Sequence, residues 1–174
     1  MLERSGRLAG LVLGAGTVCL AMIAGMFFDW AVAIMPALAG VDDRTYVAVL
    51  QQANATINGS PLFLLAFLGA FVVTGVAAVL QYRLGARAAV RWIVAALVLY
   101  VVAVGITAGV SIPLNDTLQA AGAPDAIADP AGLRTATEGP WVTGHDIRTV
   151  ATVLALGCLC RAMLLAPRGG SAVR

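Results

Sequence analysis

Residues 8–28 read LAGLVLGAGTVCLAMIAGMFF, an apolar run without a charged side chain. A helix needs about 20 apolar residues to cross a bilayer, so this run alone is long enough. A signal peptide cleaved after Ala33 is the competing interpretation. However, the run exceeds the roughly 7–15 apolar residues of a secretory signal, and it continues to Leu38 with only Asp29 and Trp30 as interruptions. We therefore predict an uncleaved first membrane span.

The composition of the whole chain points to the same class. Of the 174 residues, 60% are hydrophobic and 11% are charged, which lies far outside the range of soluble domains. There is room for one compact bundle, so we predict a single transmembrane domain over residues 1–174. The net charge of +2 comes from arginine alone, because the chain has no lysine. No basic patch indicates a nucleic-acid partner.

Three more apolar runs follow, and proline marks their ends. Ser60 and Pro61 form a helix cap and a first helical position before the second run, and Pro140 begins the fourth run in the same way. Pro36 and Pro113 predict the ends of the first and third spans, because proline lacks an N–H donor and disfavours helical geometry in the residue before it. The predicted spans cover about 8–35, 62–82, 92–112 and 140–165.

Small side chains inside these spans are interpreted as packing residues. Gly105 and Gly109 are spaced four apart, which predicts a close approach between neighbouring helices. The cysteines all lie in apolar segments, where cysteine usually acts as a small hydrophobe. Cys158 and Cys160 would diverge by about 200° on a helix, so we expect no metal site.

Between the first two spans, residues 43–58 have an amphipathic helical pattern. Tyr46, Leu50 and Ile57 recur at helical spacing, and Asp42 is a suitable cap. Gln51 and Asn54 belong to a polar ridge that also includes Asn58. The fold class is therefore all-α: an integral membrane four-helix bundle with an extra amphipathic outer helix, whose polar ridge lies over the mouth of the bundle.

The arginines predict the orientation of this bundle. Cytoplasmic loops carry an excess of arginine and lysine, so the richer side is expected to be cytoplasmic. We predict a plasma (inner) membrane protein with both termini in the cytoplasm and its polar groups at the outer leaflet. The richer side holds Arg4, Arg7, Arg83, Arg87, Arg91, Arg161, Arg168 and Arg174, and the other side holds Arg44, Arg134 and Arg148.

The last span opens with the most chemically active stretch of the chain. Trp141, His145 and Arg148 share one helical face with two threonines, and His145 is the only histidine. Polar groups inside a membrane usually face a bundle interior or a cavity. Asp29 is a second polar group for this place, although an interfacial position beside Trp30 explains it equally well.

A purely structural interpretation stands beside the functional one. Arg148 could pair with Asp146, Asp29 or Asp116, or with Asn115, because such pairs let a membrane protein tolerate charge. A haem site is poorly supported, since one histidine and scattered methionines offer no clear pair of axial ligands.

Four groups of landmarks, in order along the chain, resemble the small four-helix membrane family that includes the fungal anthrone oxygenases. They lie at helix ends and extend over nearly the whole chain. The lysine-free, alanine-rich composition is typical of a bacterial member, and most bacterial members of this family have no assigned function. The landmarks are Met35-Pro36-Ala37-Leu38, then Gln52, Asn54, Ile57 and Pro61, then Pro113-Leu114-Asn115, and finally Trp141, His145, Arg148 and Thr149.

The resemblance implies a monooxygenase that works without a metal or other cofactor on an aromatic ketone or a similar lipophilic molecule. It implies His145 as a base, Arg148 as the group that holds an oxyanion, and Asn115 and Asn54 as groups that orient the ketone or a peroxide. Trp141 would wall the aromatic ring. With Asp29 and Gln51 as further substrate-binding residues, these side chains form the candidate site. Arg148 with Asn115 matches the family pattern better than His145 does.

The second hypothesis is a non-catalytic membrane module, either a partner subunit or a binder of lipid or of a small molecule, whose polar cluster is structural. Membrane lipid and a lipophilic small molecule are the expected partners under either hypothesis, and the sequence leaves a homo-oligomer or a membrane partner open. An apolar-walled pocket between the outer helix ends would favour the enzyme. A closed and fully paired polar cluster would favour the module.

Overall fold

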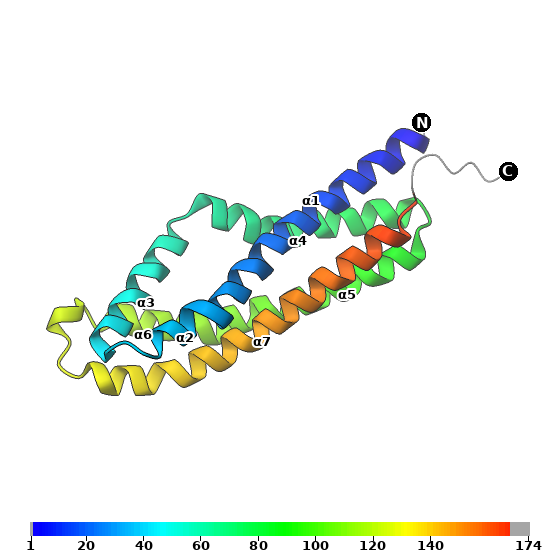
Figure 1. Ribbon diagram of the computed structural model, residues 1–174. Helices are drawn as coiled ribbons and strands as arrows, with labels where there is room; N and C mark the ends of the chain where they lie inside the picture. The colour runs from blue at the N-terminus through cyan, green and yellow to red at the C-terminus, as the bar shows by residue number, and fades with distance from the viewer. Residues whose placement is uncertain (1, 168–174) are drawn as a thin grey trace.

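A computed structural model of the protein describes the backbone of residues 2–167 and the side chains of residues 4–167. Every regular element in this part of the chain is helical (Figure 1). In chain order the elements are α1 (Leu2–Asp29), η1 (Trp30–Ile34), α2 (Met35–Leu38), α3 (Asp43–Asn58), α4 (Pro61–Arg83), α5 (Arg87–Ile106), η2 (Thr107–Ser111), α6 (Ile112–Ala120), η3 (Pro124–Ala126) and α7 (Pro130–Leu165).

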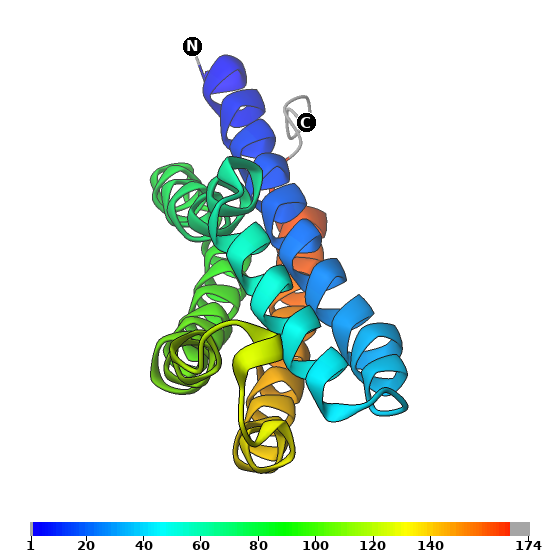
Figure 2. The same ribbon diagram turned by 90° about the vertical axis from the view of Figure 1, so that its left-hand side faces the viewer.

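Within the described residues, four helical segments are long and apolar enough to cross a membrane: Arg4–Leu38, Pro61–Arg83, Arg87–Ala120 and Pro130–Leu165. The all-α membrane bundle predicted from the sequence is therefore confirmed. The start of α1, the turn between α4 and α5, and the end of α7 lie together at one end of the bundle (Figure 1). The other end, which we call the α3 end, carries α2, α3 and α6 (Figures 1 and 2).

The amphipathic helix α3 has the predicted bounds of residues 43–58. The Asp42 side chain accepts a hydrogen bond from the Thr45 backbone N–H and so caps it, and the Ser60 side chain caps α4 through the Phe63 N–H. The apolar face of α3 packs into a hydrophobic core at the α3 end. The buried members of this core are Met35, Leu38, Tyr46, Val47, Leu50, Leu118, Ile127 and Trp141.

The helical path continues through both Pro36 and Pro113. The first segment still ends at Leu38, two residues past Pro36 and close to the predicted end, whereas the predicted end at Pro113 is wrong, because α6 runs on to Ala120. A π-helical turn precedes each proline: the Met35 N–H bonds to the Trp30 carbonyl, and the Ile112 N–H bonds to the Thr107 carbonyl. Each proline then occupies the first turn of a new α-helical segment, where its missing N–H costs little. Because the π turn is wider than an α-helical turn, the helix can continue through the proline without a break.

The predicted start of the fourth span at Pro140 is also wrong, because α7 begins at Pro130 and Pro140 lies inside it. The residue before a proline normally avoids helical geometry, since its Cβ collides with the proline ring. That residue is Gly139, which has no Cβ. Residues 117–139 therefore comprise the end of α6, the short helix η3 and the first turns of α7.

The glycine seam predicted at Gly105 and Gly109 is a further correction. A Cβ added at either position would meet nothing within 4 Å, because these glycines do not face a neighbouring helix. The close approaches lie elsewhere. A Cβ at Gly16 would stand 2.8 Å from Thr74 Oγ1, and one at Gly144 would stand 3.1 Å from a Val110 methyl carbon.

Two polar side chains hold the α3 end together. Gln51 is buried, and its side-chain amide donates to the carbonyls of Leu118 and Gly122 at the end of α6. Arg134 on α7 donates to the Val41 carbonyl and forms ion pairs with Asp43 and Glu138. These contacts fix α3, α6 and the start of α7 relative to one another.

Candidate functional site

A cavity of about 220 Å³ lies in the bundle toward the α3 end. Every long helical segment and α3 contribute to its walls, most of which are apolar. The lining residues are Met26, Phe27 and Trp30 from the first segment, Asn54, Ile57 and Asn58 from α3, Phe63, Leu64 and Phe67 from α4, Thr107, Ser111, Ile112 and Asn115 from the third segment, and Trp141, His145 and Arg148 from α7.

One face of α7 supplies the chemically active wall. Trp141, His145 and Arg148 follow at spacings of four and three residues, which places them in one column on a helix. The Trp141 and His145 rings stack with their centroids 4.9 Å apart and their planes inclined by 7°. The exposed fractions of these residues are 3%, 1% and 7%, so the column faces the interior and not the lipid.

The hydrogen bonds of His145 fix its chemical form. Its Nε2 lies 2.9 Å from the Phe27 backbone carbonyl, which can only accept, so Nε2 carries the proton. Its Nδ1 lies 2.8 Å from Nη2 and 3.2 Å from Nε of Arg148. A guanidinium can only donate, so Nδ1 carries a lone pair. His145 is therefore a neutral imidazole whose two nitrogens are both in use.

Arg148 is a buried cation without a carboxylate partner. Within the described side chains, the ion pairs are those of Arg134. Arg148 bonds instead to His145 and, at 3.4 Å from Nη1, to the Thr107 hydroxyl. Its Cζ stands 4.5 Å from the Phe27 ring centroid and 5.4 Å from that of Trp141. Cation–π contacts of this kind stabilise a guanidinium, but they leave its charge without a counter-ion.

The structural pairings considered for Arg148 therefore do not form. Asp29, Asp116 and Asp146 are exposed and make no ion pair with it within the described residues. Asn115 bonds elsewhere, since its Oδ1 accepts the Trp141 indole N–H at 2.9 Å. The polar cluster is thus neither closed nor fully paired.

Of the seven side chains predicted for the site, the structure brings five to the cavity: His145, Arg148, Asn115, Asn54 and Trp141. Asp29 and Gln51 do not line it. Asp29 follows Phe27 by two residues, which turns it about 200° away from the cavity wall, and it is exposed. Gln51 is used up in the contact between α3 and α6.

Three contributors were missed from the sequence. Thr107 and Ser111 line the cavity, and the signal for them was present: two hydroxyl residues four apart in an otherwise apolar run just before Pro113. The sequence gives no sign of the third, the Phe27 carbonyl that fixes His145, because a backbone group on another helix leaves no mark in the pattern.

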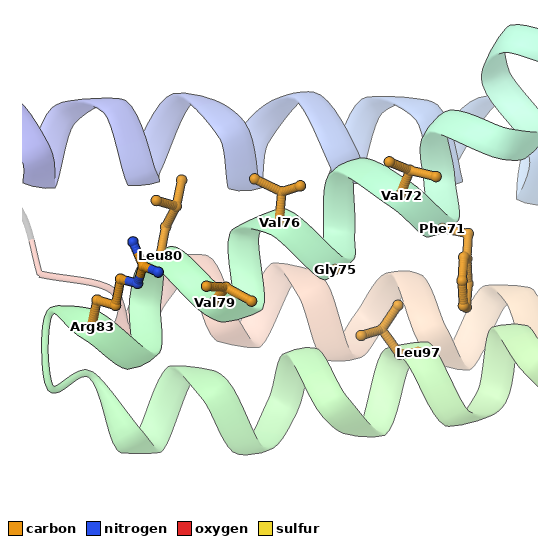
Figure 3. Close-up of a pocket in the computed structure, with 8 residues that line it drawn as sticks. All are labelled: Phe71, Val72, Gly75, Val76, Val79, Leu80, Arg83 and Leu97. Carbon is orange, nitrogen blue, oxygen red and sulfur yellow. The ribbon is translucent and has the colours of Figure 1, made fainter.

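A second hollow lies on the outer surface along α4. It is larger, about 550 Å³, and Figure 3 shows aliphatic and aromatic side chains of α4 along it, with Leu97 of α5 and with Arg83 near one end. Arg83 is its one charged lining residue. Its lining residues include no histidine and no carboxylate. The cavity lined by Arg148 and His145, which we call the Arg148 cavity, has the more polar lining of the two.

A family model described as anthrone oxygenase matches residues 63–158, more than half of the chain. The matched region includes most of α4, all of α5 and α6 and most of α7, and therefore the cavity residues from Phe63 to Arg148. Neither the curated proteins nor the solved structures contain a match to the chain.

Proposed function

Because the chain belongs to the anthrone oxygenase family, we propose that it is a membrane enzyme that oxidises an aromatic ketone, or a similar lipophilic molecule, with dioxygen and without a metal or flavin. The observation that carries this proposal is Arg148, a buried guanidinium without a carboxylate partner that lines an apolar-walled cavity. A buried charge is costly to leave uncompensated. An anionic oxygen on the bound substrate would supply the missing counter-charge.

The proposed reaction converts a ring CH2 opposite a ketone into a second carbonyl. Removal of one proton from the CH2 gives an enolate whose oxygen anion faces Arg148. The enolate passes one electron to dioxygen, and the carbon radical and superoxide combine to form a carbon–oxygen bond. The resulting peroxide anion takes up the proton that the base removed in the first step. The remaining C–H proton and the terminal OH then leave as water, so substrate and O2 give the diketone and H2O.

His145 is the proposed base, since it is the one lining side chain with a neutral nitrogen lone pair, at Nδ1. Its Nδ1 lone pair is held by Arg148. A substrate oxygen that attracts the guanidinium would draw it away from Nδ1. The Nδ1 lone pair would then be free to accept the proton of the substrate CH2. Arg148 and His145 would thus act together, with the substrate oxygen as the trigger.

The size and walls of the cavity favour a compact ligand. Pockets for drug-sized molecules usually measure roughly 300–1,000 Å³, and this cavity measures about 220 Å³. A flat ring system with few polar groups suits it better than a long lipid chain. Its apolar walls would exclude bulk water, which strengthens the attraction between the enolate and the guanidinium.

A second candidate function is binding without catalysis. The observation in its favour is that both nitrogens of His145 already have partners, as expected where a histidine only orients an anion-binding arginine. The ligand would again be a lipophilic molecule with an anionic oxygen. The two candidates differ in turnover, which one assay can measure.

The assay is oxygen consumption by the purified protein with anthrone, corrected for the non-enzymatic rate. Arg148→Ala should lower the enzymatic rate about 100- to 1,000-fold, the usual cost of removing an oxyanion-stabilising group, and His145→Ala should lower it at least about 100-fold. Arg161→Ala is the matched control, because Arg161 lies on the same helix but is exposed and outside the cavity. Ligand binding by the parent without turnover would favour the second candidate.

We also propose that the protein lies in the plasma (inner) membrane with both termini in the cytoplasm. Support comes from the arginines, which are concentrated at the end of the bundle that holds the start of α1 and the α4–α5 turn with Arg83 and Arg87. The cavity would then open toward the outer leaflet. Membrane lipid would cover the apolar groove along α4.

A further inference from the structure

We propose that Ser111 Oγ and Asn54 Nδ2 form a second oxygen-binding site in the Arg148 cavity, which receives the oxygen that the reaction adds to the ring. This inference rests on the proposed function. It assigns to Ser111 a positioning role for the peroxide and for the new carbonyl, while Arg148 holds the original ketone oxygen.

The first observation is that both atoms are buried polar groups without a partner. Ser111 is 1% exposed. Neither its hydroxyl nor the Asn54 amide nitrogen has a hydrogen bond, yet both residues line the cavity. A buried donor without an acceptor destabilises the protein, and a hydrogen bond to a ligand oxygen in the cavity would remove that cost. Because the two residues belong to different helices, they would hold this oxygen from two directions.

The second observation is that Ser111 differs from the other hydroxyl residues of its surroundings. In an apolar helix, serine and threonine usually donate to the carbonyl four residues earlier. Thr107 does so with Ala103, and Thr149 does so with His145. For Ser111 that carbonyl belongs to Thr107, which accepts the Ile112 N–H in the π turn. The Ser111 hydroxyl does not bond to it and has no other partner within the described residues.

The chemistry of the two groups selects what they bind. The Asn54 amide nitrogen only donates, and the Ser111 hydroxyl can donate as well. The bound group must therefore offer lone pairs, as a peroxide oxygen or a carbonyl oxygen does. In the proposed reaction such an oxygen appears at the ring carbon opposite the ketone. Ser111 and Asn54 would donate hydrogen bonds to it and would not be consumed, since the departing water takes its protons from the substrate.

The test compares two ligands that differ in this oxygen. Anthrone has one carbonyl and anthraquinone has two, and binding of each can be followed without oxygen by quenching of tryptophan fluorescence, because Trp141 and Trp30 line the cavity. Ser111→Ala should weaken anthraquinone binding about fivefold to tenfold, the effect of one hydrogen bond, and should change anthrone binding less than about twofold. Equal changes for both ligands, or no change, would overturn the proposal.

Thr74→Val is the matched control. The Thr74 hydroxyl is also buried and without a partner, but it lies outside the cavity, so both affinities should stay at the parent value. Asn54→Ala makes the same comparison from α3, and it replaces Ser111→Ala if that variant does not fold. A selective loss of anthraquinone affinity in the Thr74 variant would contradict the assignment.

Failure of this inference can be told apart from failure of the proposed function. If the parent has no turnover but Ser111→Ala still weakens anthraquinone selectively, the second oxygen site stands and the oxygenase activity is refuted. If the parent turns over and Ser111→Ala shows no selective effect, only the second site is refuted. If the parent binds neither ligand, both are refuted.

Discussion

Arg148 and His145 illustrate how far a sequence can specify a site at the scale of single residues. Their spacing of three predicted that they would meet on one face of α7. The form of the histidine could not be predicted, because it depends on the Phe27 carbonyl from α1. The lack of a counter-ion for Arg148 could not be predicted either. The sequence offered three aspartates as partners, but all three are exposed in the structure. Contacts within one helix follow from periodicity, and contacts between helices do not.

Gly16 gives a prediction about stability at this scale. An added Cβ would lie 2.8 Å from Thr74 Oγ1 and 3.2 Å from the Thr74 backbone nitrogen, so α1 and α4 would have to separate. We expect Gly16→Ala to lower the stability by about 1–3 kcal/mol, as overpacking usually does. Thermal unfolding in detergent, followed by circular dichroism, measures this.

Gly14→Ala is the control, because Gly14 lies on the same helix with nothing within 4 Å of an added Cβ. Alanine favours a helix over glycine by up to about 1 kcal/mol, so this variant should be unchanged or more stable. Similar losses from both substitutions would show that α1 and α4 do not meet at Gly16.

At the scale of elements, the sequence predicted helices better than it predicted their ends. The bounds of α3 were correct because Asp42 caps its start through a local hydrogen bond. The end predicted near Pro36 was close to the observed end at Leu38, but the end predicted at Pro113 and the start predicted at Pro140 were wrong. Proline removes one backbone hydrogen bond, but a helix can still continue through it when a π turn or a glycine precedes it. Whether the helix continues depends on how it packs against the other helices.

The cap of α3 gives a prediction about pH. Hydrogen bonds from the Thr45 hydroxyl and backbone N–H lower the pKa of Asp42 below its usual value of 3.8. A lowered pKa in the folded state means stabilisation that is present above the ordinary pKa and is lost as the pH falls through the folded value. We therefore expect hydrogen exchange in the first turn of α3 to become less protected below pH about 4, after correction for the intrinsic exchange rate.

Asp42→Asn separates the charge from the cap. Asparagine caps a helix about as well as aspartate but does not titrate, so protection in this variant should be independent of pH in the same range. An unchanged pH profile in the variant would assign the effect to another group.

At the scale of the whole molecule, the cavity and the interhelical polar contacts of α3 and Arg134 lie toward one end of the bundle. This arrangement was predicted, because each polar landmark follows or precedes a span on the same side. The set of residues that line the cavity could not be predicted, because these residues come from every long helical segment and from α3. Their closeness follows from packing at the α3 end, where Gln51 and Arg134 fix elements that are distant in sequence.

The proposed orientation can be tested with reporter fusions. A fluorescent protein that folds only in the cytoplasm should be bright at the C-terminus and dark when inserted between Gly122 and Asp129, in the connection from α6 to α7. Alkaline phosphatase, which is active only outside, should give the reverse. The opposite pair of results would mean that the arginine distribution does not set the topology of this chain.

The π turn at residues 107–111 also has an evolutionary consequence. Relative to a regular helix it acts as a one-residue insertion, and each residue turns a helix by about 100°. A deletion there would leave the hydropathy profile almost unchanged while it rotated Asn115 away from Trp141. Descendants that lost this one residue would still look like members of the family, and they would no longer carry the site.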